Sequence, residues 1–346
     1  MSKRAVISLL TLCLLLAACR PAQETKLTVM THDSFAVSEA VIAAFEEEHQ
    51  ARVEFLAAGD AGAVLNKAIL TRSAPLADVL YGLDNTFLSR ALEADLFEPS
   101  DSPLLDRIPE QFQLDAEHRA LPVDYADVCI NYDRAYFSEN GLEVPASLAD
   151  LLRPEYNGLL VVENPSTSSP GLAFLLASVD TFGDPGYLDF WSALRDNGVV
   201  VVDGWDTAYY TNFSASSGRG PQPMVVSYAS SPAAEVVFAD PPVTESPTAS
   251  ILAPGTCFRQ VEFAGILRGT QNRRLAERFI DFLLSVQFQQ DMPLQMFVYP
   301  VNPDAVVPDV FSQWAGQPEQ PASLDAETIR VNRDRWIQAW SEVMFP

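Results

Sequence analysis

The chain has few of the residues on which most catalytic and metal-binding motifs depend. Its 346 residues include three histidines and four cysteines. No histidine falls in an H-E-x-x-H pattern and no two cysteines have Cys-x-x-Cys spacing, so the sequence predicts no metal site. The G-x-S-x-G, Walker and dinucleotide-binding motifs are also missing, and these absences favour binding over catalysis. We therefore expect no catalytic residue and no cofactor.

Positive charge is scarce as well. The chain has 22 Lys and Arg residues against 46 Asp and Glu residues, which gives a formal net charge of −24. Recognition of nucleic-acid phosphates needs a basic patch, so this composition excludes nucleic acid as a partner. The long-range field favours cationic ligands, although net charge does not fix the sign of a local site. The length suits about two globular domains.

Only one long apolar run is present, and it lies near the N-terminus. Residues 5–18 follow two basic residues and are too short to span a bilayer, which is typical of an export signal. The sequence LAAC that ends at Cys19 resembles a bacterial lipobox, in which the cysteine is lipidated. We expect residues 1–18 to be a signal peptide, and residues 19–26 to be a lipid-anchored tether in the periplasm or on the outer face of the cytoplasmic membrane. The alternative is an ordinary cleavage site with an incidental cysteine.

Strand and helix patterns alternate along the rest of the chain. The periodicity predicts strands at residues 26–31, 52–56, 77–81, 159–163, 199–202 and 224–228. It predicts helices at residues 38–49, 63–70, 171–179, 274–284 and 326–343, and one that opens at Asp84 or Asn85. Such alternation implies an α/β fold with a mostly parallel sheet.

Two isolated strands, at residues 126–132 and 256–263, separate the two alternating sets. We interpret them as crossovers between two α/β lobes. The expected first lobe comprises residues 27–125 and 260–346, and the expected second lobe comprises residues 126–259.

Polar or aromatic clusters follow the predicted strands or precede a predicted helix. They lie at residues 31–35, 58–62, 82–85, 167–171, 203–205 and 228–232. In two facing α/β lobes these clusters lie at the cleft, which is the usual ligand site. Helix-start hydroxyls and N–H groups bind anions, an aromatic ring provides a stacking surface, and an aspartate offsets a cation. The clusters suit a small cationic aromatic ligand, with or without a phosphate.

A structural reading of the same residues stays open. Asp84, Ser168 and Ser231 also fit as helix caps, Asp60 fits as a turn residue, and Trp205 fits as a core aromatic.

Six segments resemble the periplasmic thiamine-binding proteins of bacterial ABC importers, a branch of the type 2 periplasmic solute-binding proteins. In chain order they are LTVMTHDSFA, ADVLYGLDN, NPSTSSPGL, DGWDTAY, VVSYASSPA and YPVNPDA. The resemblance implies a two-lobe type 2 periplasmic binding fold with two crossover hinge strands. It also implies a protein that is not an enzyme, closes on thiamine or its mono- or diphosphate, and delivers the ligand to an ABC transporter permease. We expect a monomer.

The resemblance also implies a set of ligand-binding residues. They are Asp60, Ala61, Ser168, Ser169, Trp205, Tyr228, Ala229, Ser230 and Ser231, with His32, Asp84, Tyr209 and Phe297 as further candidates. Asp60 is expected near the pyrimidine or the cation, Trp205 and Tyr228 pack on the ligand, and the serines bind a hydroxyl or phosphate.

The sequence departs from the family at three of its aromatic positions. His32, Ala234 and Phe297 stand where the family can place a tyrosine or tryptophan. A lost stacking contact is expected to weaken binding by about 1 kcal/mol or to signal a changed ligand.

Two cysteines besides Cys19 would remain after export to an oxidising compartment. Cys129 and Cys257 are therefore a candidate disulfide, although spacing alone does not establish the bond. The resemblance places both on neighbouring crossover strands and so implies a disulfide across the hinge. The alternative is two buried, reduced thiols.

Two other functions stay open. One is a ferric-iron-binding protein of the same fold, for which Tyr209 and Tyr210 are the candidate ligands. The other is a thiaminase-like enzyme with Cys129 as nucleophile and Asp124, Asp127 or Glu262 as base. A disulfide would disable that enzyme because only a thiolate attacks.

Overall fold

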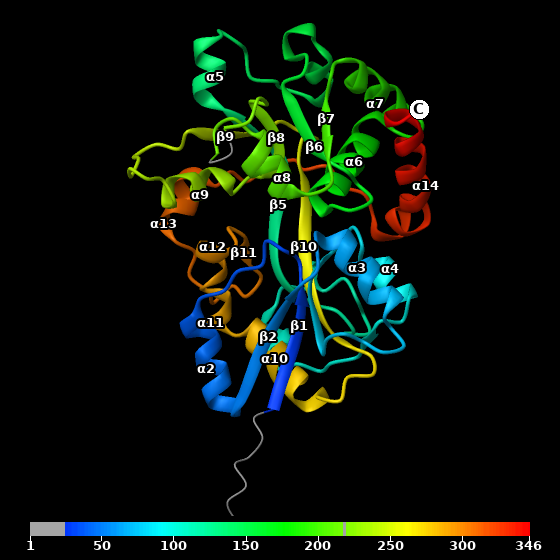
Figure 1. Cartoon of the computed structure of the whole chain (residues 1–346), viewed down its shortest axis with the longest axis vertical. Coiled ribbons are helices and arrows are strands. Elements are labelled where there is room, and N and C mark those ends of the chain that lie inside the picture. The colour runs from blue at the N-terminus through cyan, green and yellow to red at the C-terminus, as the bar shows by residue number, and fades with distance from the viewer. Residues whose placement is uncertain (1–24, 217–218) are drawn as a thin grey trace, which may run out of the picture.

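The computed structural model describes residues 25–216 and 219–346. The predicted signal peptide, the lipidation site at Cys19 and nearly all of the tether lie outside the described residues. The chain forms two α/β halves that are stacked along the long axis of the molecule and joined by two long strands (Figure 1). No helix in the described part of the chain has the length and apolar character needed to cross a membrane.

In the described part of the chain eleven strands form one continuous sheet, with eight of them in the order β2-β1-β3-β10-β5-β8-β6-β7. The strands are β1 (Thr25–Thr31), β2 (Ala51–Ala57), β3 (Val79–Asp84), β4 (Phe97–Glu98), β5 (Leu121–Asp133), β6 (Leu160–Glu163), β7 (Val200–Val202), β8 (Met224–Tyr228), β9 (Thr248–Ile251), β10 (Phe258–Leu267) and β11 (Tyr299–Pro300). Strand β4 pairs with β10, and β9 and β11 pair with β5.

The pairing directions divide the sheet. Strand β1 runs parallel to β2 and β3, and β6 runs parallel to β7 and β8. Strands β5 and β10 are antiparallel to each other and extend through both halves (Figure 1). The two predicted crossover strands are therefore present, and both are longer than the sequence suggested.

Helices cover the sheet in both halves. They are α2 (Glu39–His49), α3 (Ala61–Leu70), α4 (Leu88–Glu93), α5 (Arg134–Glu139), α6 (Ser169–Phe182), α7 (Gly186–Asp196), α8 (Trp205–Thr207), α9 (Ser231–Val237), α10 (Arg273–Leu284), α11 (Val286–Gln289), α12 (Met292–Gln295), α13 (Asp309–Trp314) and α14 (Ala326–Met344). Short 3-10 helices occur at residues 105–107, 110–112, 148–152 and 154–156, and a π-helical turn at Ala208–Asn212 follows α8.

The apolar periodicity of the sequence explains how these helices pack. Ile42 and Phe45 form the buried face of α2, where the Phe45 ring meets Phe279 of α10 edge-on at 5.2 Å. Helix α6 is buried along most of its length and lies so close to β6 that a Cβ at Gly171 would be 2.5 Å from the Glu163 carbonyl oxygen. Only glycine fits there without a shift of the backbone.

The prediction that a helix begins at Asp84 or Asn85 is wrong. Strand β3 runs to Asp84, and α4 begins four residues later at Leu88. The Asp84 carboxylate accepts hydrogen bonds from the backbone N–H groups of Thr86 (2.7 Å) and Phe87 (3.3 Å). The aspartate therefore closes a turn after the strand, a geometry that resembles a helix cap in sequence.

The C-terminal helix packs against the second half of the molecule, although the sequence boundaries assign residues 260–346 to the first. The buried Trp340 ring meets Trp191 of α7 edge-on at 5.6 Å. At its other end α14 reaches the first half, where Arg330 pairs with Glu93 of α4. This helix thus connects the two halves along the right-hand flank of the view in Figure 1.

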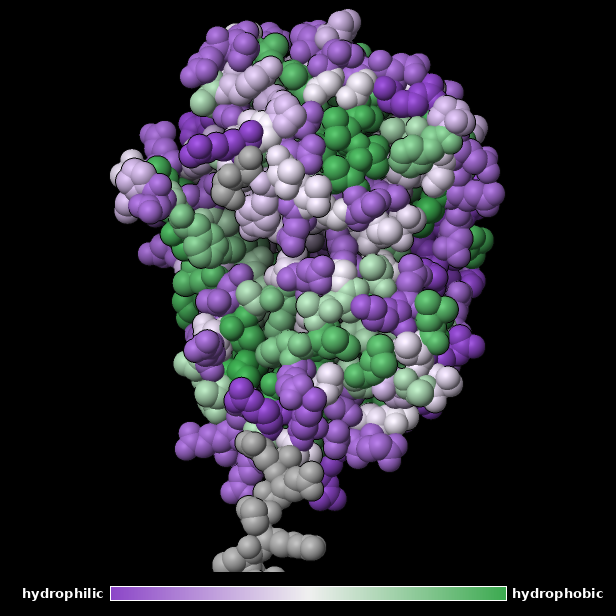
Figure 2. Space-filling model, viewed as in Figure 1, coloured by the Kyte–Doolittle hydropathy of each residue, from purple (hydrophilic) through white to green (hydrophobic). Residues whose placement is uncertain are grey.

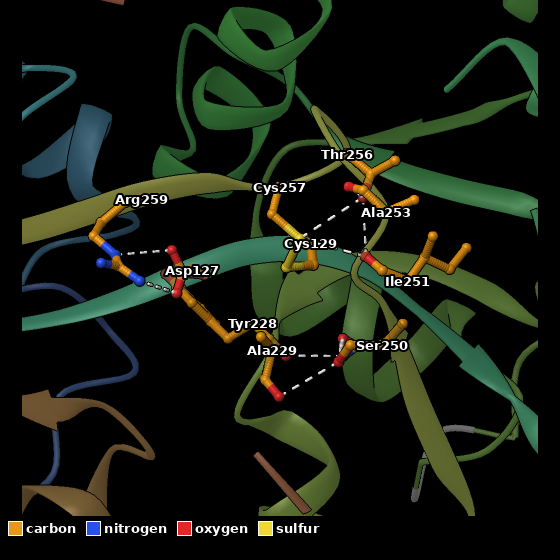
Figure 3. Close-up of a disulfide and its surroundings, with 11 residues drawn as sticks. Asp127, Cys129, Tyr228, Ala229, Ser250, Ile251, Ala253, Thr256, Cys257 and Arg259 are labelled. Atoms are coloured by element: carbon orange, nitrogen blue, oxygen red, sulfur yellow. Dashed lines mark hydrogen bonds and ion pairs between the residues drawn. A yellow bond between two sulfur atoms is a disulfide. The ribbon is translucent and has the colours of Figure 1, made fainter. Parts of the chain in front are cut away.

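The two long strands are cross-linked where they pass between the halves. Cys129 on β5 and Cys257, which directly precedes β10, are joined by a disulfide bond (Figure 3). Beside it the Arg259 guanidinium donates to both carboxylate oxygens of Asp127, at 3.0 and 2.7 Å. A covalent bond and a bidentate ion pair therefore hold the crossover together.

On the face of the molecule shown in Figure 2, hydrophilic side chains dominate both ends, in keeping with the strongly acidic composition.

Candidate ligand-binding site

A cavity of about 420 Å³ lies between the two halves. The segments that follow β1 and β2 contribute its wall in the first half, and α8 with the N-terminal ends of α6 and α9 contribute its wall in the second. Strands β5 and β10 form its floor, and the segment around α12 closes one side. A volume of this size is typical of small-molecule sites.

Most of the residues predicted from the sequence line this cavity. They are His32, Asp60, Ala61, Ser169, Trp205, Tyr209, Tyr228, Ser231 and Phe297, together with Ala234. Four others, Asp84, Ser168, Ala229 and Ser230, are buried behind the lining. Ala229 packs with the disulfide, and Asp84 bonds within its own turn and to Gln260.

Asp60 connects the two walls. It precedes α3, and its Oδ1 accepts a hydrogen bond from the Ala61 N–H at 2.7 Å, as expected of a helix N-cap. Its Oδ2 accepts a hydrogen bond from the Trp205 N–H at 3.2 Å, across the cavity. Burial raises the pKa of the Asp60 carboxyl above its ordinary value, and hydrogen bonds from these partners work against that rise. The structural alternative for Asp60 was a turn residue, and the structure makes it the N-cap of α3, a role that is compatible with a place in the cavity lining.

The two halves also touch elsewhere at the rim of the cavity. The Gly62 N–H donates to the Thr167 carbonyl oxygen at 3.1 Å, and a Cβ at Gly62 would lie 2.8 Å from that oxygen. The Ser34 hydroxyl donates to Asp206 Oδ1 at 3.2 Å. These contacts join segments far apart in the sequence, so the structure represents a closed arrangement.

An aromatic wall is held in place by hydrogen bonds at its edges. The Trp205 ring stacks on Tyr209 with 4.9 Å between centroids and a 17° angle between planes. Trp205 Nε1 donates to Ser227 Oγ at 2.9 Å, and the Tyr209 hydroxyl donates to Glu235 at 2.7 Å. Because their polar atoms are already bonded, these rings present flat faces that are fixed before a ligand arrives.

The floor of the cavity is acidic. From the sequence, Asp124 and Glu262 were considered only as the base of a thiaminase-like enzyme. Asp124 from β5 and Glu262 from β10 are cross-strand partners, and both line the cavity. Burial, followed by the charge of Glu262, raises the pKa of the Asp124 carboxyl well above its ordinary range. His32 Nε2 lies 3.7 Å from Glu262 Oε2. Burial alone would lower the pKa of His32, but the carboxylates of Glu262, Asp60 and Asp206 outweigh it and raise the pKa.

Carboxyl groups predominate around the cavity, and among the described lining residues His32 is the one basic side chain. These carboxyl groups belong to Asp33, Asp60, Asp124, Asp206 and Glu262. The lining residues of the described chain include no lysine or arginine. Such a cavity stabilises a cation by direct charge interaction.

A different chemistry is present where α6 and α9 begin. Ser169 is the first residue of α6, a helix of fourteen residues, and Ser231 is the first residue of α9. The buried hydroxyl groups of Ser169 and of Ser230 make no hydrogen bond. Helix-start N–H groups and free hydroxyls are donors for an anionic or hydroxyl group.

Several aromatic or apolar residues of the cavity lining were not predicted as ligand-binding residues from the sequence. They are Phe35, Tyr210, Phe238 and Met296. Phe238 meets Phe297 edge-on at 5.3 Å. Phe35 belongs to the cluster at residues 31–35, and Tyr210 was a candidate ligand for ferric iron, so these two had a signal in the sequence, whereas Phe238 and Met296 had none.

The fold and this cavity define a class of protein. Residues 74–315 match the family described as bacterial extracellular solute-binding protein, and the chain belongs to that family. Among curated relatives, the thiamine-binding periplasmic protein of Brucella suis is 30% identical over 347 residues, covering 97% of this chain and 98% of its own. The corresponding protein of Salmonella typhimurium is 29% identical over 336 residues, covering 96% and 97%.

Solved structures agree with the sequence relatives. A structure titled periplasmic thiamin binding protein superposes with a TM-score of 0.82 at 26% identity, covering 94% of this chain and 98% of that one. A ferric ion-binding protein A of Pasteurella haemolytica superposes with a TM-score of 0.73 at 17% identity, covering 93% and 98%, and shares the fold alone. The predicted resemblance and the predicted type 2 periplasmic binding fold are both confirmed.

Proposed function

We propose that this protein captures thiamine, or its mono- or diphosphate, in the cavity between its two halves and delivers it to the permease of an ABC importer. The observation that carries the proposal is a closed cavity with five carboxyl groups and a fixed aromatic wall. The thiazolium ring of thiamine is permanently cationic and flat, so both features serve it at once. The similarity to thiamine-binding relatives over nearly the whole chain supports the same ligand.

The walls of the cavity suggest how the ligand lies. Asp60 and the floor carboxyls offset the positive charge, while Trp205 and Tyr228 pack against the ring. The helix starts at Ser169 and Ser231 receive the hydroxyl or phosphate at the other end. The contacts of Asp60 with Trp205 and of Gly62 with Thr167 then close the halves over the ligand.

We further propose that a lipid on Cys19 anchors the mature monomer outside the cytoplasm. The LAAC sequence and the preceding apolar run support this. The described chain begins at the free end of β1, at the tip of the molecule farthest from α7 (Figure 1). Metabolic labelling with a radioactive fatty acid tests the anchor. Labelled wild-type protein and unlabelled Cys19→Ser protein are expected, and equal labelling of the two would contradict it.

Isothermal titration calorimetry of the purified protein tests the ligand. The panel contains thiamine, thiamine monophosphate, thiamine diphosphate, aminopyrimidines and ferric ion. We expect one ligand per chain for a thiamine compound, in the micromolar range or tighter, and no binding of ferric ion. A panel in which no thiamine compound produces heat would refute the proposal.

The two other functions have less support. Among residues 25–216 and 219–346 no three His, Cys, Asp or Glu side chains group as metal ligands, and the Tyr209 hydroxyl is already bonded to Glu235. The thiaminase-like reaction needs a Cys129 thiolate, whereas the structure joins this cysteine to Cys257.

A further inference from the structure

Three carboxyl-bearing residues lie side by side on adjacent strands at the floor of the cavity. Glu262 on β10 is the register partner of Asp84 on β3 and of Asp124 on β5. Like charges directly opposite each other on neighbouring strands destabilise a sheet, and burial increases the cost. A fold that retains this row therefore needs something to stabilise it.

The outer two members of the row are stabilised by the protein itself. Asp84 accepts hydrogen bonds from Thr86 and Gln260. Asp124 accepts one from the hydroxyl group of Tyr81. Both residues are fully buried, with no exposed surface. Asp84 lies behind the lining of the cavity, whereas Asp124 lines it and keeps only Oδ1 without a hydrogen bond.

Glu262 differs from both. Its side chain keeps 13% of its surface exposed, and it lines the cavity. Its Oε2 is buried without a hydrogen-bond donor, and so is Oδ1 of Asp124 on the neighbouring strand. Within the described chain His32 is the ion-pair partner of Glu262, with Nε2 3.7 Å from Oε2, and this Nε2 atom likewise has no hydrogen-bond partner. Of the three carboxyl groups in the row, the middle one thus keeps exposed surface in the cavity, which its two neighbours lack.

We propose that Glu262 binds the amino-bearing nitrogen heterocycle of the ligand, and that Asp124 and His32 act as positioning residues that hold its carboxyl group toward the cavity. An aminopyrimidine supplies the N–H donors that the floor lacks, and no residue assigned to ligand binding from the resemblance does this at the floor. This inference rests on the proposed function, because thiamine carries such a ring.

The surroundings of Glu262 predict that binding at this subsite is linked to protons. The titratable groups that face it are His32 after β1, Tyr81 and Asp84 on β3, Asp124 on β5 and Tyr228 on β8, with Asp60 and Asp206 acting on His32. Helix α12 contributes the neutral side chain of Gln295 and the adjoining Met296. Burial, followed by the charge of Glu262, raises the pKa of Asp124, so a ligand that brings positive charge or donors to the floor favours the ionised form of Asp124 and binding releases protons.

Calorimetry with two ligands and three proteins tests the subsite. The ligands are thiamine and its analogue in which oxygen replaces the pyrimidine amino group. The proteins are the wild type, Glu262→Gln, and Glu163→Gln as a matched change at a buried carboxyl outside the lining. We expect the wild type and Glu163→Gln to prefer thiamine by about tenfold or more, and Glu262→Gln to lose that preference.

Proton release provides a second readout. Titrations in buffers of different ionisation enthalpy are expected to show protons released by the wild type and fewer by Glu262→Gln. Wild-type discrimination below about twofold, or discrimination and proton release unchanged in Glu262→Gln, would overturn the inference. If Glu262→Gln fails to fold, the wild-type discrimination and proton release decide.

Free 4-aminopyrimidine separates this inference from the proposed function. If thiamine fails to bind but 4-aminopyrimidine raises the melting temperature of the wild type and not of Glu262→Gln, the subsite stands and the proposed function falls. If neither compound acts on the wild type, both fall.

Discussion

Replacing Asp60 by asparagine gives a sharp prediction, because this carboxylate has two separable tasks. Its Oδ1 caps α3 through the Ala61 N–H, and its Oδ2 accepts the Trp205 N–H from the opposite wall. Asparagine keeps one oxygen for the cap but places an NH2 group opposite the Trp205 N–H. The change removes a negative charge from the cavity and the acceptor that joins the two walls.

The size of the effect follows from these contacts. A hydrogen bond to a charged group contributes about 1.5–3 kcal/mol, and the closed state loses one. Loss of the charge near a cationic ring adds to this. We therefore expect Asp60→Asn to weaken thiamine binding by about tenfold to a thousandfold. The free energy of unfolding is expected to change by less than about 1 kcal/mol, since the cap survives.

Calorimetry measures the affinity, and chemical denaturation measures the stability of the same variant. Asp203→Asn is the matched control because it makes the same charge change beside Trp205 but outside the cavity lining. If Asp60→Asn binds thiamine within about twofold of the wild type, the reasoning about charge and closure is wrong. A similar loss in Asp203→Asn would show that net charge, and not the position of Asp60, controls binding.

Three further predictions concern stability and closure. Burial raises the pKa of Asp84 from 3.8 to about 7, so the folded state holds this proton more tightly. The resulting stabilisation is complete below about pH 4 and is lost as the pH rises to about 7. Asp84→Asn should remove this pH dependence, on the order of 4 kcal/mol, from the free energy of unfolding. A pH dependence equal to that of the wild type would refute the raised pKa. Changing both Cys129 and Cys257 to serine removes a cross-link between residues 128 apart in sequence. A denaturant titration should show a free energy of unfolding about 5 kcal/mol lower. No change would mean that the bond does not form. Gly62→Ala places a Cβ against the Thr167 carbonyl, which opposes the closed contact between the halves. We therefore expect weaker ligand binding and, in small-angle scattering, a larger radius of gyration of the ligand-bound protein. Wild-type values of both quantities would contradict the closed contact.

Local signals explain why much of the fold could be predicted from the sequence. The alternation around Val29 and the run of valines that ends at Val202 mark strands, because β-branched residues fit a pleated buried surface. The apolar stripe of the helix that contains Phe279 marks its buried face. Clusters that follow strands were brought to the cavity because strand ends in both halves face each other.

Other features depend on contacts between distant residues and left no local signal. Ser38 precedes α2 as expected, yet its hydroxyl donates to Asp291, 253 residues away, instead of capping the helix. The pairing of Glu262 with Asp124 depends on the register of two strands that are far apart in sequence. Strand register is fixed by long-range packing, so a sequence pattern identifies such strands without showing which side chains meet across them.

A crystal structure of the protein grown with thiamine tests most directly whether a flat cation is held between the two halves. We expect electron density for the thiazolium ring in the cavity, against Trp205 and within contact distance of Asp60, with the aminopyrimidine toward Glu262. Density for thiamine on another surface, or an empty cavity at saturating thiamine, would contradict the account.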